Sequence, residues 1–168
     1  MVPVQNETGI NSPPGVPEQN SNLHTLNRIL SFSFLTGSVG ILSDLLLMHH
    51  YEGYSQSIPI LLLSLSAIIF LANLSLKTNW LLRTFKYSLV ILTICAVLGV
   101  YFHLAGKAAF KTEIDPSLEG WTLILTCITG NSLPPVLAPG SIILVALFGY
   151  AWAVVNTHNY RAYKTYEK

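Results

Sequence analysis

The sequence predicts an all-α integral membrane protein, a four-transmembrane-helix bundle with a short outer-side half-helix before the last span. Only 10 % of its 168 residues are charged and its mean hydropathy is +0.51, whereas about 25 % of residues are charged in soluble domains. Four apolar stretches are close to the ~20 residues that a helix needs to cross a bilayer. Lysine and arginine also gather on one flank of these stretches, as in multi-pass membrane proteins.

The membrane domain is predicted to cover residues 28–158. Each span must bridge about 30 Å of hydrocarbon at about 1.5 Å per helical residue. The last span includes the Pro139-Gly140 step as its opening turn, where proline is tolerated. The four predicted spans are residues 29–48, 58–76, 87–105 and 136–157.

Two polar tails flank this domain. Residues 1–27 contain four prolines, many Asn, Gln and Ser, and no Lys or Arg, which predicts a disordered cytoplasmic tail rather than a signal peptide. Residues 159–168 mix tyrosines with cations, which predicts a basic-aromatic cytoplasmic tail that touches anionic lipid.

A further apolar stretch, residues 121–130, is too short to cross the bilayer. The Pro134-Pro135 pair follows it, and proline cannot continue a helix. We therefore expect an interfacial or half-inserted helix here. The alternative is a fifth span.

The cations predict the orientation. Arg28, the loop of residues 77–86 and the C-terminal tail carry seven of the nine Lys and Arg residues, and only Lys107 and Lys111 fall on the other side. The positive-inside rule then places both termini in the cytoplasm.

Small and weakly polar residues predict the helix contacts, because lipid gives apolar side chains no drive to associate. Residues three, four or seven apart share one face of a helix. The predicted contact faces are Ser33, Gly37, Gly40 and Asp44 in the first span, Ser66 and Asn73 in the second, Cys95, Gly99 and His103 in the third, and Gly149, Ala153 and Asn156 in the fourth.

A cluster of titratable residues is expected at the outer ends of the first and third spans. The two spans run in the same direction, so their outer ends lie at similar depth. A carboxylate inside a span is costly unless it is paired, protonated or turned toward the bundle. The candidate site residues are Asp44, His49, His50, Glu52 and His103.

Several chemistries use such residues. Two histidines bind a b-type haem, histidine with carboxylate binds a divalent metal such as zinc, and an Asp–His pair relays protons or holds a quinone head group. A purely structural Asp44–His103 pair is the leading interpretation. The leading expectation is accordingly no cofactor, with haem b or a divalent metal as alternatives.

Other function classes lack their signatures. No Gly-rich phosphate loop, HExxH sequence or nucleophile elbow occurs in the chain. The net charge of +1 argues against nucleic-acid binding. Cys95 and Cys127 lie in apolar runs without CxxC spacing, which favours two core thiols over a disulfide.

Three short stretches resemble an uncharacterised group of small bacterial multi-pass inner-membrane proteins. They are His50-Tyr51-Glu52-Gly53 after the first span, residues 100–106 (VYFHLAG) and residues 133–139 (LPPVLAP). Leu133 stands where the group is expected to have Gly. The resemblance implies a bacterial inner membrane and no particular activity.

The sequence therefore favours a non-enzymatic accessory or structural subunit that associates with other membrane proteins or with itself. The alternatives are a redox-linked membrane subunit that binds haem, quinone or a metal at the outer-end histidines, and a small-solute or proton conduit formed by an oligomer.

Overall fold

The computed structural model describes residues 16–49, 51–129 and 137–166, and the side chains of residues 21–49, 51–129 and 137–157. Within these ranges the chain is all-helical and contains no strand. Its helices are α1 (Val16–Leu47), α2 (Tyr54–Leu76), α3 (Asn79–Ile114), α4 (Gly120–Thr129) and α5 (Leu137–Tyr166).

Four of these helices contain stretches long and apolar enough to cross a membrane. The fourfold pattern of hydropathy in the sequence therefore corresponds to four separate helices, and by length and composition the chain is a multi-pass membrane protein. The stretches are Ser21–Leu47, Tyr54–Leu76, Asn79–Ile114 and Leu137–Thr157.

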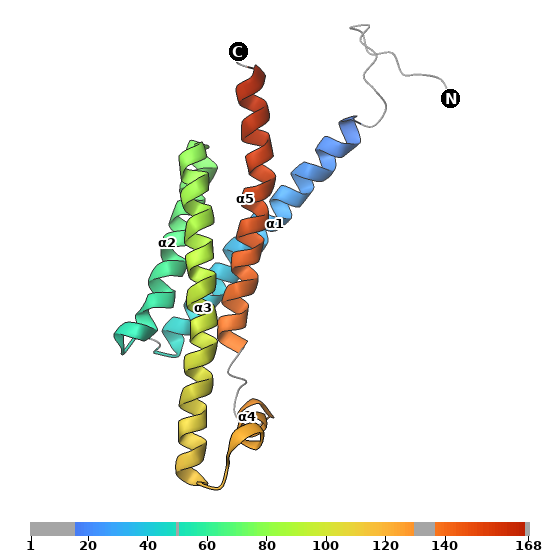
Figure 1. Cartoon of the computed structure of the whole chain (residues 1–168). Coiled ribbons are helices and arrows are strands. Elements are labelled where there is room, and N and C mark those ends of the chain that lie inside the picture. Colours follow the sequence, from blue (N-terminus) through green and yellow to red (C-terminus); the bar gives the residue numbers. More distant parts are fainter. Residues whose placement is uncertain (1–15, 50, 130–136, 167–168) are drawn as a thin grey trace, which may run out of the picture.

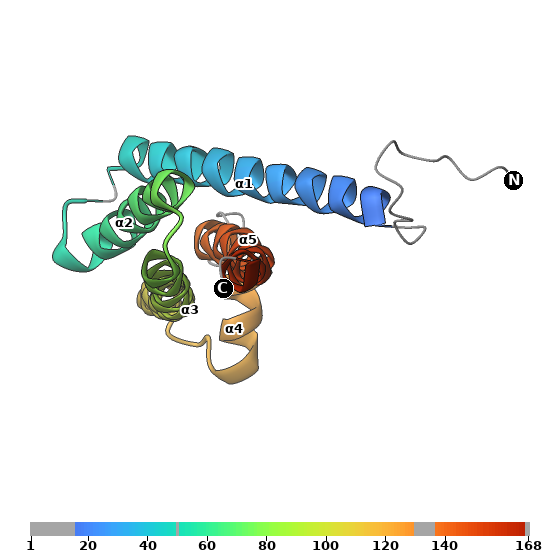
Figure 2. The ribbon, with the colours of Figure 1, turned by 90° about the horizontal axis from the view of Figure 1, so that it is seen from above.

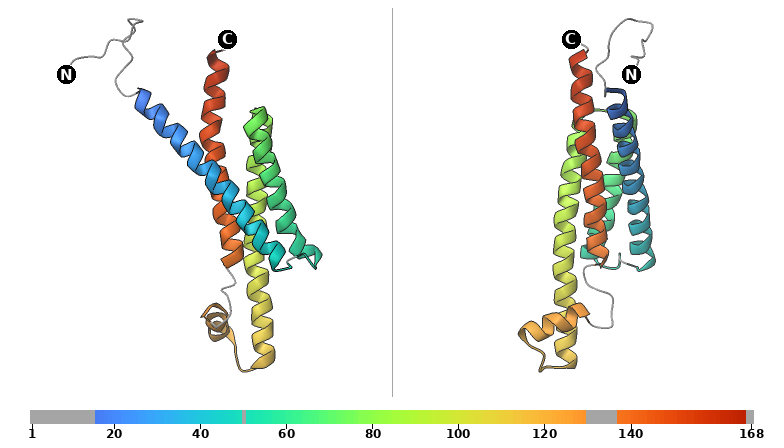
Figure 3. Two further views of the ribbon diagram at one scale, coloured as in Figure 1. Left: turned by 180° about the vertical axis from the view of Figure 1, so that it is seen from behind. Right: turned by 90° about the vertical axis from the view of Figure 1, so that its right-hand side faces the viewer.

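The helices form an open bundle. In Figure 1, α2, α3 and α5 stand side by side, and α1 crosses them obliquely. Seen from above in Figure 2, α1 and α2 lie along one side of the α3–α5 pair and α4 lies on the other. The main contacts join α3 to α5, α1 to α5 and α2 to α3, with smaller ones between α1 and α2 and between α3 and α4. The start of α1, the end of α5 and the α2–α3 turn share one end of the bundle, and α4 lies at the opposite end, as the views in Figure 3 also show.

Four aromatic rings, one from each long helix, form the centre of the bundle. Phe34 of α1, Phe70 of α2, Phe85 of α3 and Trp152 of α5 are all buried. Neighbouring ring centroids are 4.6 to 5.8 Å apart in tilted or edge-to-face arrangements. Such pairs contribute about 0.5–1.5 kcal/mol each beyond the area that they bury. The aromatic cluster therefore ties all four long helices together.

Small and polar residues surround this aromatic cluster. Gly149 of α5 is buried beneath Phe34, and a Cβ added to it would lie 2.8 Å from the Phe34 ring. Ser66 of α2 donates a hydrogen bond to Ser88 of α3 with Oγ atoms 3.1 Å apart. Ser66 and Asn73 are fully buried, which confirms the predicted inward face of α2.

The contact face of α1 differs in part from the predicted one. Leu30, Phe34, Ser38 and Leu45 are its buried residues, whereas Gly40 has no atom within 4 Å of an added Cβ. Of the predicted stripe, Gly37 does lie in the contact, because an added Cβ would be 2.5 Å from Val145 Cγ2 of α5. The predicted face therefore matches the contact in part, and large apolar residues such as Phe34 fill the rest of it.

The helix ends also differ from the predicted spans. α3 begins eight residues before 87 and ends nine residues after 105. Thr78 caps its start by accepting from the Leu81 N–H, and Pro116 follows its C-cap Asp115. α1 begins at Val16, with Pro17 in the first turn, where proline is favoured. Residues 16–27 are thus helical, and the rest of the predicted disordered tail, residues 1–15, lies outside the described residues.

The short apolar stretch forms α4, which has ten residues. At about 1.5 Å per residue it spans about 15 Å, half of the hydrocarbon thickness. The five-span alternative is therefore wrong, and α4 packs against α3 at the end of the bundle far from the chain termini (Figure 1). Cys127 is buried there, and both Cys95 and Cys127 are free thiols.

Candidate functional site

A groove opens between α1, α3 and α5 at the end of the bundle far from the chain termini. Its volume is about 560 Å³. From α1, residues about four apart on one face line the groove. α3 adds the side chain of His103, and α5 adds the residues of its first turn. The described residues that line the groove are Gly40, Ile41, Asp44, Leu45, Met48, His103, Leu137, Ala138, Pro139 and Ser141.

Three polar side chains face this mostly apolar groove. Asp44 comes from α1, His103 from α3 and Ser141 from α5. The Ser141 hydroxyl donates to the Leu137 carbonyl at 2.9 Å. No hydrogen bond or ion pair joins the Asp44 carboxylate to another described residue. The groove thus combines a carboxylate with an imidazole in otherwise apolar surroundings.

The helix contacts below the groove hold these residues in place. Gly99 lies one turn before His103 on α3, and a Cβ added to Gly99 would lie 3.6 Å from Pro139 Cγ. This is ordinary van der Waals distance, so the first turn of α5 packs against α3 at Gly99. On α1, Gly37 has no room for a side chain, because an added Cβ would lie 2.5 Å from Val145 Cγ2 of α5.

The other predicted site residues do not line the groove. His49 has a left-handed backbone, with φ 54°, and its Nδ1 lies 3.2 Å from the Leu47 carbonyl oxygen. Its ring packs near Tyr51, with ring centroids 5.7 Å apart. Glu52 is exposed in the turn between α1 and α2. His50 lies outside the described residues.

The four predicted site residues that the structure describes are therefore divided between two places. Asp44 and His103 share the groove, and His49 and Glu52 belong to the α1–α2 turn. Within the described part of the chain, no three His, Cys, Asp or Glu side chains are grouped to hold a metal ion.

Sequence reasoning missed the contribution of α5 to the groove. Pro139 and Ser141 lie in the predicted fourth span, but nothing in the hydropathy pattern assigns them to a site. The Pro139-Gly140 step was one available signal, because proline in a first helical turn fixes where the helix begins. The position at which α5 begins then determines which of its residues lie beside His103 in the groove.

Comparisons with protein-family models, with curated proteins and with solved structures gave no match to this chain. The groove and the residues around it are therefore the basis of the functional argument.

Proposed function

We propose that the protein is a non-enzymatic accessory subunit of a membrane complex, and that its groove receives a helix of a partner membrane protein. The observation that carries this proposal is Asp44. It lies on a candidate span, lines the groove and has no polar partner among the described residues.

The energetic reason is the cost of an unpaired carboxylate next to lipid. That cost is about 2.5–3.5 kcal/mol at the centre of a span and less near its ends. A partner helix that brings a cation or a hydrogen-bond donor to Asp44 removes this cost. Gly40, one turn away on α1, has open space where a Cβ would be, so a second helix can approach the α1 backbone closely.

The proposal includes a location in a bacterial inner membrane with both termini in the cytoplasm. The start of α1, the end of α5 and the α2–α3 turn lie at the same end of the bundle in Figure 1. The excess of Lys and Arg on those segments supports a cytoplasmic assignment for that end. The short stretches that resemble bacterial inner-membrane proteins support the choice of membrane.

The first test is co-purification of the tagged full-length chain from native membranes in a mild detergent. A membrane protein is expected to be recovered with it in stoichiometric amount. In Asp44→Asn the recovery of that protein should fall about tenfold, because one charge-assisted hydrogen bond contributes about 1.5–3 kcal/mol. Quantitative mass spectrometry of the eluate measures the ratio.

Glu52→Gln is the matched control, since it neutralises an exposed carboxylate near the same end of the bundle but outside the groove. It should leave the ratio unchanged. Recovery of the chain alone, or equal loss of the partner from both variants, would contradict the proposal. Gel filtration of each variant establishes that it remains folded.

A second candidate function is supported by the presence of both Asp44 and His103 in one groove. Its volume of about 560 Å³ is within the range of about 300–1,000 Å³ for small-molecule sites. An acid and an imidazole beside an apolar surface suit a quinone head group, which exchanges protons as it is reduced. This would make the chain a redox-linked subunit.

The redox-linked candidate predicts that solvent extraction of the purified protein yields about one quinone per chain. His103→Ala should remove most of it, because the imidazole supplies one of the groove's three polar side chains. The control is His24→Ala, which changes an exposed histidine of α1 at the other end of the bundle. A quinone-free wild-type extract from native membranes, with no haem absorbance, would eliminate this candidate.

A further inference from the structure

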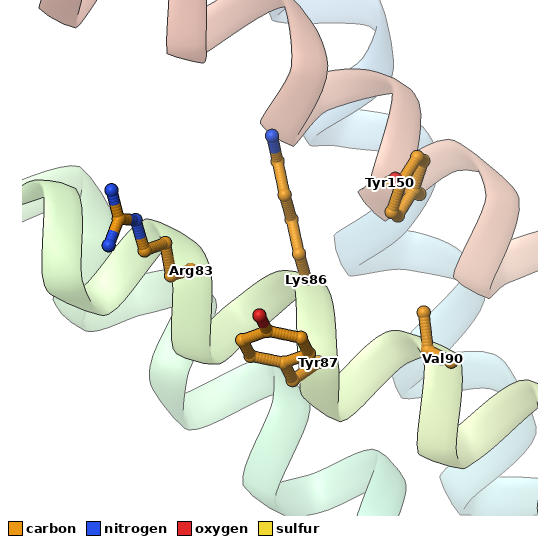
Figure 4. A pocket seen from close by; sticks show the side chains of 5 residues that line it. All are labelled: Arg83, Lys86, Tyr87, Val90 and Tyr150. Atoms are coloured by element: carbon orange, nitrogen blue, oxygen red, sulfur yellow. The ribbon is translucent and has the colours of Figure 1, made fainter.

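A second pocket lies on the opposite side of the membrane domain from the groove, toward the chain termini. It has a volume of about 310 Å³ and is formed by α3 and α5. Residues 83, 86, 87 and 90 follow helical spacing, so they share one face of α3. Figure 4 shows its described lining: Arg83, Lys86, Tyr87 and Val90 from α3, and Tyr150 from α5.

The lining contains two cations, two phenol hydroxyls and no carboxylate. In Figure 4 the Lys86 side chain extends from α3 toward α5, the Arg83 side chain leaves α3 one turn earlier, and the Tyr87 ring lies below both in this view. Lys86 donates a hydrogen bond to Thr157 of α5 at 2.7 Å. This bond holds the ammonium group across the α3–α5 contact.

The pocket lies at the predicted boundary between hydrocarbon and lipid head groups. Hydropathy starts the third span at about residue 87 and ends the fourth at residue 157. The cations therefore lie at head-group depth, and Val90 lies one turn further into the hydrocarbon. Tyr87 and Tyr150 are 69 % and 42 % exposed, so the pocket is open sideways toward the lipid. Tyr87 at this depth presents its ring to the acyl chains and its hydroxyl to the polar layer. Tyr150 is seven residues before 157 and therefore lies about 10 Å deeper, near Val90.

We propose that this pocket binds a phosphate group, carried either by an anionic phospholipid or by free phosphate. Arg83 and Lys86 supply charge and donors to the phosphate oxygens. The Tyr87 hydroxyl donates a further hydrogen bond, and Val90 and Tyr150 contact the first part of an acyl chain when the phosphate belongs to a lipid. The site is independent of the groove and of the proposed partner.

The test uses the full-length chain in a neutral detergent and native mass spectrometry with three probes. They are dioleoylphosphatidylglycerol, dioleoylphosphatidylcholine with the same acyl chains, and inorganic phosphate. The wild-type chain should bind phosphatidylglycerol at least tenfold more tightly than phosphatidylcholine. Arg83→Gln should weaken phosphatidylglycerol binding about fivefold, as expected for one cation at an anionic surface.

Two further variants make the result specific. Tyr87→Phe removes one hydroxyl without a charge and should weaken phosphatidylglycerol binding about twofold to threefold. Lys77→Gln removes a cation at the same end of the bundle but outside the pocket, and should leave binding unchanged. Arg83→Gln keeps the Lys86–Thr157 bond, so a loss of binding in this variant does not come from a broken α3–α5 contact.

The three probes separate the two sources of phosphate. Selective phosphatidylglycerol binding that millimolar inorganic phosphate does not displace supports a lipid ligand. Inorganic phosphate that binds the wild-type chain and is lost in Arg83→Gln supports free phosphate. Equal binding of the two lipids without inorganic phosphate binding, or equal weakening by Lys77→Gln and Arg83→Gln, would overturn the proposal.

Discussion

Replacing Phe70 with alanine is expected to lower the free energy of unfolding by about 2 kcal/mol. In water such a substitution costs about 3–5 kcal/mol, which combines the transfer of the side chain with the cavity left behind. Lipid is as apolar as the core, so mainly the cavity term remains. The cost is still large because Phe70 contacts the rings of Phe34, Phe85 and Trp152. Unfolding by sodium dodecyl sulfate in mixed micelles, followed by circular dichroism, measures the change.

Phe32→Ala is the matched control for this prediction. Phe32 is on α1 close to Phe34 in sequence, but its side chain is 70 % exposed on the bundle surface. Its loss exchanges one apolar contact with lipid for another, so the free energy of unfolding should change by less than about 0.5 kcal/mol. If the two alanine variants were equally stable, the aromatic cluster would not be what joins the four long helices.

Replacing Gly149 with leucine is expected to be at least as damaging, at about 3 kcal/mol or more. A Cβ at this position already meets Phe34 Cδ2 at 2.8 Å and Leu89 Cδ1 at 3.1 Å, and leucine adds three further carbons in the same direction. Overpacking a filled core costs about 1–3 kcal/mol for smaller insertions. The same unfolding experiment should show either a strongly destabilised bundle or separation of α5 from α1.

Gly106→Leu provides the control for Gly149→Leu. Gly106 lies on α3, and no atom comes within 4 Å of a Cβ added there. Leucine is also the better helix former, so this variant should be at least as stable as the wild type. A second check is Phe34→Leu in the Gly149→Ala background, which frees space above residue 149. Strict additivity of these two substitutions would show that Gly149 and Phe34 do not limit each other.

Hydropathy alone was sufficient to predict the number of long helices. It could not predict their ends, because these depend on capping groups rather than on hydrocarbon thickness. α3 continues from the Thr78 cap to the residues before Pro116, and charged Lys107 and Lys111 do not interrupt it, since lysine is a good helix former.

The aromatic cluster was not visible in the sequence for a different reason. Phe34, Phe70, Phe85 and Trp152 each lie in a run where the other faces of the helix are apolar as well. Hydrophobic periodicity reports which side of a helix avoids water, and a span surrounded by lipid has no such side. Only the polar exceptions, such as Ser66 and Asn73, marked an inward face.

The candidate site was predictable in part. Parallel directions of the first and third spans correctly bring Asp44 and His103 to one groove. His49 and Glu52 escape this reasoning because they follow the last helical turn of α1, where the left-handed conformation of His49 redirects the chain. Helical spacing therefore predicts which residues lie on one face only as far as Leu47, where α1 ends.

The length of α3 has a practical consequence for how the molecule meets water. Its last nine residues, at about 1.5 Å each, reach about 14 Å past the hydrocarbon edge that hydropathy predicts at residue 105. The corner between α3 and α4 then lies in water, outside the lipid. A soluble antibody fragment raised against this corner should bind the molecule without touching the bilayer, and its bound mass should help to align particles in imaging.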